Sequence, residues 1–383
     1  MAKRSIKGCG CAIAILVVVL GAAAFAGWKY VLPWWKLKPP PPSGGELQVH
    51  VLDVGPVEGD SILIIVPGGK SVLIDAGDAG KGKVVIEALQ RYNVQQLDYF
   101  IATHPHPDHL GGADEVLKTT KVLNVIDNGE GPDVPESLAS QSKAGAGNKA
   151  GADKKSGKQK AAPKSASSAI TKFYDEYKEA ITQSGAHYEK AQAGAKYDLG
   201  GGARLIVLAP SEPLFTKDQV KTGGNLPNAN SIVLRLEYGD FSMLLAGDAE
   251  DQTEHRMLTK DLNLKATVLK VGHHGSKYAT NQEFVDRVKP EVAIVSCGEW
   301  NRYGHPAQVV LDRLKSANTR LYRTDLQGEI TITTRGKEND FVVKAAKENT
   351  TDVWLGRTAQ KDDSSRSGFI AYGDFGPPPK KKQ

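Results

Sequence analysis

THPHPDHLGG, at residues 103–112, is the most informative stretch of this chain, because it places three histidines and one aspartate within a few positions. It directly follows an apolar run at residues 97–102, which is short, bounded by turn formers and typical of a buried strand. The whole chain contains only nine histidines, so the clustering is not what chance would give. Imidazole and carboxylate groups are ligands for zinc and similar divalent ions. The stretch therefore predicts a metal site at the end of a strand.

The spacing inside this stretch indicates two ions. His104 and His106 are two residues apart in an extended segment, so both side chains can reach one ion. Asp108 and His109 lie where the backbone turns, and they can reach a second ion a few ångströms away. A polar loop that happens to contain histidines is the alternative interpretation, and the histidine count argues against it.

Other blocks of sequence accompany the stretch. They read VLDVG at 51–55, GDSILI at 59–64, LIDAG at 73–77, GD at 247–248, LKVGHHGS at 269–276 and NRYGHP at 301–306. In this order the blocks resemble the metallo-β-lactamase-fold hydrolases and, within them, the soluble domain of the ComEC-type DNA-internalisation competence proteins. The resemblance covers about residues 47–335. It does not include the multi-helix channel of the complete competence proteins, so DNA transport does not follow from it.

The resemblance implies a four-layer αβ/βα sandwich of the metallo-β-lactamase type. The hydrophobic pattern by itself supports only an α/β or α+β class, with strands interrupted by helices in two successive halves. Strands are expected within 46–66 (two), at 71–75, 97–102, 122–126, 204–209, 231–238, 241–246, 267–271 and 291–296, and within 320–334. Helices are expected at 83–92, from the end of the histidine stretch toward 118, and at 169–183, 251–262 and 307–316.

The later blocks supply the remaining candidate ligands. Asp248 follows a predicted strand, and an aspartate at this position in the family bridges both ions. His273 and His274 follow the strand predicted at 267–271. Because neighbours in an extended chain point in opposite directions, the two histidines are not expected to bind metal equally. We favour His274 as the metal ligand, and His273 would then either form a hydrogen bond nearby or face the substrate. His305 is either a further ligand or an acid that contacts the substrate.

One expected ligand is missing. The dinuclear pattern of the family has another histidine between the opening stretch and the bridging aspartate, and only His187 is available there. Its neighbours favour a structural role. Asn228 and Asn230 occupy the stretch before the predicted hairpin, but amides are poor zinc ligands. The first two histidines of the opening stretch are therefore expected to hold the weaker ion.

Two Zn²⁺ ions are the expected cofactors, with Mn²⁺ as the alternative. Such ions lower the pKa of bound water from 15.7 to about 7, which provides hydroxide at neutral pH. Asp108 is expected to orient that hydroxide, and Asp248 to hold the ions together. Lys270 could add positive charge for a phosphate, although a lysine is more often solvated or ion-paired. Asp108, Lys270 and His273 are the predicted catalytic residues. Asp75 is expected to brace the metal loops by hydrogen bonds rather than to bind metal.

The N-terminal part of the chain reads as a membrane anchor. Residues 8–28 are uncharged and, at about 1.5 Å per residue, just span a hydrocarbon core of about 30 Å. Lys3, Arg4 and Lys7 precede them, which favours a cytoplasmic N-terminus and an exported body. The alternative is a cleaved signal peptide, because residues 24–26 resemble a cleavage site. Both interpretations place the hydrolase domain outside the cytoplasm, either anchored by a single span or secreted.

Three parts are therefore expected. Residues 1–45 are the anchor and a proline spacer, residues 46–349 are the hydrolase-like domain, and residues 350–383 are a flexible tail. Within the domain, residues 129–168 are rich in Ala, Gly, Lys, Ser and Gln and read as a disordered insertion.

The formal net charge of +5 comes from the ends and the insertion. Without them the chain has a net negative charge, whereas a nucleic-acid-binding domain normally carries its own basic face. The lysine-rich insertion could contact anionic polymers or lipid.

The leading hypothesis is a metal-dependent hydrolase of phosphodiester bonds, with nucleic acid among the candidate substrates. The second is a hydrolase of cyclic acyl compounds such as β-lactams or lactones. The third is a non-catalytic, membrane-tethered module that binds metal or an interaction partner.

Overall fold

The computed structural model describes residues 45–132, 166–220, 225–300 and 303–358. The predicted anchor at 8–28 and most of the predicted insertion at 129–168 lie outside these residues. Among the helices of the described part, none is long and apolar enough to cross a membrane. The anchor and the insertion stay predictions.

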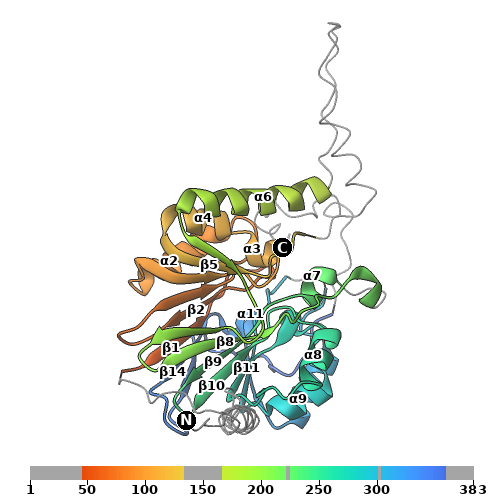
Figure 1. Cartoon of the computed structure of the whole chain (residues 1–383). Helices are drawn as coiled ribbons and strands as arrows, with labels where there is room; N and C mark the ends of the chain where they lie inside the picture. The colour runs from red at the N-terminus through yellow and green to blue at the C-terminus, as the bar shows by residue number, and fades with distance from the viewer. Residues whose placement is uncertain (1–44, 133–165, 221–224, 301–302, 359–383) are drawn as a thin grey trace, which may run out of the picture. The chain divides into compact units, whose positions relative to one another are not determined.

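Two β-sheets form the centre of the structure (Figure 1). In order across the first sheet, the strands are β15 (Val342–Ala345), β14 (Ile330–Thr334), β1 (Leu47–Val51), β2 (Ile62–Ile65), β3 (Ser71–Ile74), β4 (Gln96–Ile101), β5 (Lys121–Asp127) and β6 (His187–Lys190). The second sheet runs β13 (Arg320–Arg323), β12 (Val292–Val295), β11 (Val268–Lys270), β10 (Phe241–Leu245), β9 (Val233–Tyr238), β8 (Ala203–Ala209) and β7 (Lys196–Gly200). Strands β3 to β6 are parallel to one another, and so are β10 to β13.

Helices cover the outer faces of both sheets. α2 (Gly82–Arg91), α4 (Ala113–Thr119) and α6 (Ala166–Ser184) lie over the first sheet (Figure 1). On the side of the second sheet, α9 (Gln282–Val288) contacts both α8 (Asp251–Leu258) and α10 (Gln308–Ser316), and α8 contacts β8. Shorter helical turns are α3 (Pro107–Leu110), η2 (Lys217–Gln219), α7 (Leu226–Ala229), η3 (Gly272–Gly275) and α11 (Thr324–Gln327). The mixed α/β, two-sheet architecture is therefore as expected.

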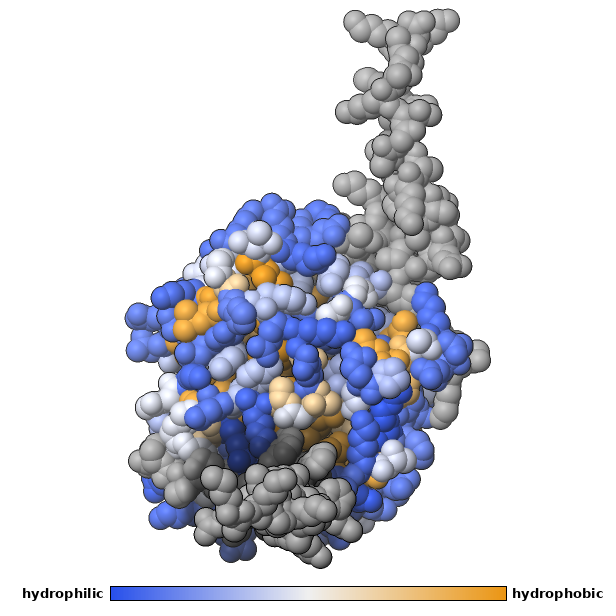
Figure 2. All heavy atoms as spheres, in the orientation of Figure 1, coloured by the Kyte–Doolittle hydropathy of each residue, from blue (hydrophilic) through white to orange (hydrophobic). Residues whose placement is uncertain are grey.

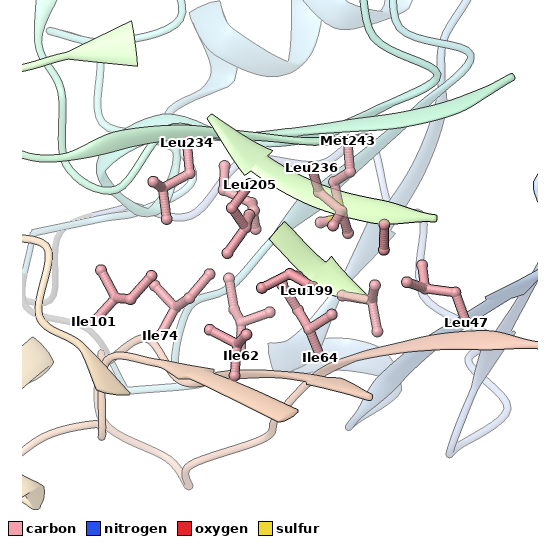
Figure 3. Packing of buried hydrophobic residues seen from close by; sticks show 14 of the residues in the cluster. Leu47, Ile62, Ile64, Ile74, Ile101, Leu199, Leu205, Leu234, Leu236 and Met243 are labelled. Carbon is pink, nitrogen blue, oxygen red and sulfur yellow. The ribbon is translucent and has the colours of Figure 1, made fainter. Parts of the chain in front are cut away.

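The main core lies between the two sheets. Side chains of the first sheet point toward side chains of the second sheet and meet them in one apolar layer (Figure 3). From the first sheet these include Leu47, Ile62, Ile64, Ile74 and Ile101, and from the second Leu205, Leu234, Leu236 and Met243, all at most 2 % exposed. Each such side chain contributes about 1.5–3 kcal/mol through burial, so the pairing of the sheets is strongly favoured.

A second core joins the first sheet to its helices, with Val85, Leu89, Val116 and Tyr177 packed against Leu73 and Phe100. Where residues are described, the face in Figure 2 is mainly hydrophilic, and its hydrophobic residues form separate groups. Most large apolar side chains thus lie buried between the layers of sheets and helices.

Apart from the shorter helical turns, β7, α9, β15 and most of β6 have no counterpart in the expected pattern. β15 alternates exposed and half-buried residues, and β6 is largely exposed, so neither carries a strong apolar signal. The folded domain also continues past residue 349, where its C-terminal boundary was predicted. The Arg323 guanidinium donates to the carbonyl oxygens of Val353 and Leu355, and the Arg357 N–H donates to that of Pro306.

Candidate metal centre

The predicted ligands gather where strands of both sheets end. β4 leads into the stretch at 103–109, whereas β10 leads to Asp248 and β11 to His274. Carboxyl ends of parallel strands meet at one edge of a sheet, which is where ligand sites form in such folds. The Ile232 N–H donates to the Thr103 carbonyl oxygen at 2.9 Å and joins the second sheet to the first at this edge.

Four side chains form the larger group of candidate ligands, and their ligand atoms all lie within 4.8 Å of one another: Asp108, His109, Asp248 and His274. Asp248 Oδ1 is 3.2 Å from His109 Nε2 and 3.6 Å from His274 Nε2. These three atoms are buried and have no hydrogen-bond partner. Buried polar atoms without a partner are rare in proteins. Their convergence fits a divalent ion bound between them.

The orientation of two histidines is set from the far side of each ring. His109 Nδ1 is 2.7 Å from Asp75 Oδ2, and His274 Nδ1 is 2.9 Å from the Ser296 carbonyl oxygen. Because these oxygens only accept, Nδ1 carries the proton in the neutral form of each ring, and Nε2 then turns its lone pair toward the group. Asp75 also accepts from the Thr103 N–H at 2.7 Å and hydroxyl at 2.8 Å, so it occupies the bracing position expected of it.

A smaller group consists of His104, His106 and Asp248. His104 Nε2 is 2.9 Å from His106 Nδ1 and 3.7 Å from Asp248 Oδ2. Asp248 thus presents Oδ2 to this group and Oδ1 to the larger one. His187 lies exposed on β6, beside Asn124 of β5, so it does not supply the missing ligand.

Asn225 lies at the site, although nothing in the sequence pointed to it. Its amide nitrogen is 3.1 Å from His106 Nε2, and its amide oxygen is buried without a partner. The reverse orientation of this amide would let the oxygen accept the His106 Nε2 proton. His106 Nδ1 would then keep its lone pair for the smaller group.

Burial and charge act against each other in this cluster. Burial lowers the pKa of His104 and of His106, which favours the neutral, metal-binding form of each ring. Burial alone would also lower the pKa of His109, but Asp248 and Asp75 outweigh it and raise that pKa well above its usual value. Burial would raise the pKa of Asp248, but the surrounding histidines lower it strongly, so the carboxylate stays ionised.

His273 lies beside the larger group rather than in it. It and His274 have φ of 47° and 52°, so the pair forms a left-handed turn instead of the extended segment that was expected. His273 Nε2 is 3.8 Å from Asp248 Oδ2, and its side chain is 20 % exposed. Burial lowers its pKa to about 4, so the ring is neutral near pH 7.

Lys270 is buried in an ion pair, which is the alternative to the phosphate-binding role expected for it. Its side chain is fully buried, with Nζ 2.8 Å from Asp60 Oδ2 and 3.0 Å from the Val271 carbonyl oxygen. Burial alone would raise the pKa of Asp60, but Lys270 and His274 lower it, so the pair is ionic. Asp60 Oδ1 is also 3.4 Å from His274 Nδ1, a contact across the sheets that the sequence did not reveal.

Among the described residues, His305 belongs to none of the candidate ligand groups, so the geometry gives no support to the first of its two expected roles, that of a further metal ligand. Its Nδ1 is 2.8 Å from Glu58 Oε1, and both side chains are nearly buried. Its ring centroid is 5.4 Å from that of His273 and 6.4 Å from that of His274. His305 is therefore a neighbour of the centre.

Comparisons with known proteins agree with the geometry. Residues 54–188 match the Metallo-beta-lactamase superfamily. ComE operon protein 3 of Bacillus subtilis is 30 % identical over 78 % of this chain and 34 % of its own length. Recombination protein 2 of Haemophilus influenzae is 28 % identical over 74 % of this chain and 28 % of its own length. Competence protein ComA of Neisseria gonorrhoeae is 38 % identical over 27 % of this chain and 15 % of its own length.

These matches confirm the resemblance to the metallo-β-lactamase fold and to ComEC-type competence proteins. The chain spans about a third of the length of the first of these relatives and less of the others.

Proposed function

We propose that this chain, which carries a metallo-β-lactamase superfamily domain similar to part of the competence proteins, is a metal-dependent hydrolase of phosphodiester bonds. One observation carries the proposal: the Asp248 carboxylate presents one oxygen to each of two adjacent His/Asp groups. Such a shared carboxylate suits a pair of ions, the arrangement used in many phosphoester-cleaving enzymes. Zn²⁺ is the expected metal, and Mn²⁺ is the alternative.

Each side chain of the centre has its own role in this proposal. When bound, the ions would supply positive charge beside the scissile bond and lower the pKa of a water molecule. Asp108, whose side chain is 22 % exposed, orients the attacking water from the solvent side. Asp248 keeps the two groups at a fixed separation. His273, 20 % exposed, contacts the substrate next to them.

The choice of a phosphodiester rests on the relatives, one of which is named a recombination protein and another a competence protein. Both names point to nucleic acid as the class of substrate. Lys270 is buried and does not support this choice. The net negative charge outside the ends and the insertion does not favour binding along an extended stretch of DNA. We therefore favour a substrate that places one phosphodiester group, or a short stretch of nucleic acid, at the centre.

The test is hydrolysis of bis-p-nitrophenyl phosphate by the whole chain loaded with Zn²⁺ or Mn²⁺. We expect metal-stimulated cleavage, a loss of at least about 100-fold in His274→Ala, and unchanged activity in His187→Ala, which removes an exposed histidine outside both groups. A protein that binds metal but cleaves no phosphodiester would contradict the proposal.

Nitrocefin, tested in parallel, separates this activity from hydrolysis of cyclic acyl compounds. Turnover of nitrocefin alone would assign the centre to acyl chemistry. Metal binding without turnover of either compound would favour the non-catalytic hypothesis.

A further inference from the structure

A short segment near the end of the described chain, residues 352–357, is fastened to the body by an arginine from the second sheet. We call this segment the C-terminal strap. Arg323, at the end of β13, is only 1 % exposed. Its Nη1 donates to the carbonyl oxygens of Val353 at 3.0 Å and Leu355 at 2.6 Å. A buried guanidinium with two backbone acceptors holds the strap in one position.

Asp325 completes the fastening. It accepts two hydrogen bonds from Arg323, at 3.0 and 2.8 Å, and one from Arg357 Nε at 2.5 Å. Burial alone would raise the pKa of Asp325, but the two arginines lower it. The carboxylate is therefore charged, and it links the body to the last residues of the strap.

The strap in turn holds the loop that carries His305. The Arg357 N–H donates to the Pro306 carbonyl oxygen at 3.0 Å. The Gln308 side chain accepts from the Gly356 N–H at 2.8 Å and donates to the Trp354 carbonyl oxygen at 3.0 Å. A Cβ on Gly356 would lie 2.8 Å from Gln308 N, so the strap approaches the loop too closely for a larger residue.

The same loop contacts the turn that carries His273 and His274. The Ala307 N–H donates to the Gly275 carbonyl oxygen at 2.9 Å, one residue after His274. A Cβ on Gly275 would lie 2.6 Å from Pro306 Cβ. Pro306 and Ala307 thus connect the strap to the turn that carries His273 and His274.

We propose that the C-terminal strap is part of the frame of the active site, and that Arg357 is a positioning residue that sets the place of His305 beside the centre. The strap contacts no candidate ligand in the described hydrogen bonds; it acts through the loop at 303–307. The consequence for turnover rests on the proposed hydrolase function, whereas the consequence for the loop does not.

The first experiment measures hydrogen–deuterium exchange of the whole chain, with no activity required. Arg357→Ala removes one bond to Asp325 but leaves Arg323 in place, so the fold is kept. We expect at least about tenfold faster exchange at residues 303–307 in Arg357→Ala and in Gly356→Ala. Arg357→Lys should restore much of the protection. Leu355→Ala is the matched control, because this side chain of the strap is 63 % exposed and its backbone bonds are kept.

The second experiment measures steady-state kinetics with bis-p-nitrophenyl phosphate. We expect Arg357→Ala to lower kcat/KM about tenfold with unchanged metal content, because small displacements of a substrate-contacting group are costly. In a His305→Ala background the same change should have little further effect, since the two residues act through one group.

Exchange at residues 303–307 that is the same in Arg357→Ala and the wild type would overturn the proposal. So would a loss of kcat/KM that is equally large in the His305→Ala background, because it would show an effect independent of His305. If no phosphodiester is cleaved at all, the proposed function fails, and the exchange experiment still decides whether the strap positions the loop.

Discussion

His109 and His274 show how single residues prepare this centre. Each ring donates from Nδ1 to an oxygen that can only accept. In addition, neither Nε2 has a hydrogen-bond partner in the protein. The acceptors differ: a carboxylate from Asp75 serves one ring, and the carbonyl of Ser296 serves the other. Only the first of these can be altered by a side-chain substitution.

Asp75→Asn is therefore a sensitive test of the bracing role. Asp75 accepts three hydrogen bonds through two oxygens, and an amide offers only one acceptor atom. We expect metal affinity to fall about 10- to 100-fold, as measured by competition with a chromophoric chelator. Asp114→Asn, which changes a carboxylate on α4 paired with Lys118, should leave the affinity unchanged. Equal affinities in the two variants would argue against the bracing role.

Lys270→Met distinguishes a structural lysine from a substrate-binding one. It leaves the ionised Asp60 buried and without its cation, so the free energy of unfolding should fall by about 3–5 kcal/mol in urea denaturation. Lys277→Met, at an exposed position of the neighbouring loop, is the control and should change stability little. If Lys270 served the substrate instead, the variant would keep its stability and lose only activity.

At the scale of elements, α3 and α4 hold the histidine stretch against the turn that follows β3. Gly111, between these helices, packs against backbone: an added Cβ would overlap the backbone nitrogen of Ala79. This contact positions the loop of Asp108 and His109, and no side chain is small enough to replace the glycine.

Gly111→Ala should therefore destabilise the protein by about 1–3 kcal/mol or more in urea denaturation, because the backbone segments must move apart. Gly131→Ala is the control, since its Cβ would make an ordinary contact with Tyr174 at 3.6 Å. Equal stability of the two variants would show that the segments can separate at little cost.

At the scale of the whole domain, the centre lies at an edge shared by the two sheets. His104, His106 and His109 come from the loop after β4, whereas Asp248 and His274 follow β10 and β11. An ion held by both sets would join the sheets, in addition to the apolar layer between them. We therefore expect metal binding to stabilise the fold.

Thermal unfolding measures this coupling. An ion that binds only the folded state, at 1,000 times its dissociation constant, adds about 4.1 kcal/mol, so excess Zn²⁺ should raise Tm and EDTA should reverse the increase. In His274→Ala the increase should be much smaller. A Tm that is the same with Zn²⁺ and with EDTA would mean that no metal joins the sheets.

Much of this protein is determined by short windows of its sequence. The apolar runs before residues 103, 247 and 272 predict strands, and the side chains that follow them are of metal-ligand types, which the structure brings together at one edge. Periodicity and residue chemistry are local properties, and they can be read without knowing the partners.

The partners themselves were decided only by the tertiary structure. The sequence is compatible with a Lys270 that faces a phosphate, and only the structure shows that it pairs with Asp60. Likewise, nothing near Asn225 in the sequence indicates that this residue contacts His106. The strap was expected to be flexible because it is polar, yet Arg323 and Asp325 hold it through bonds to its backbone and to Arg357. A hydrogen bond or ion pair depends on distance and direction in space, and residues far apart in the chain acquire these only when the two sheets pack.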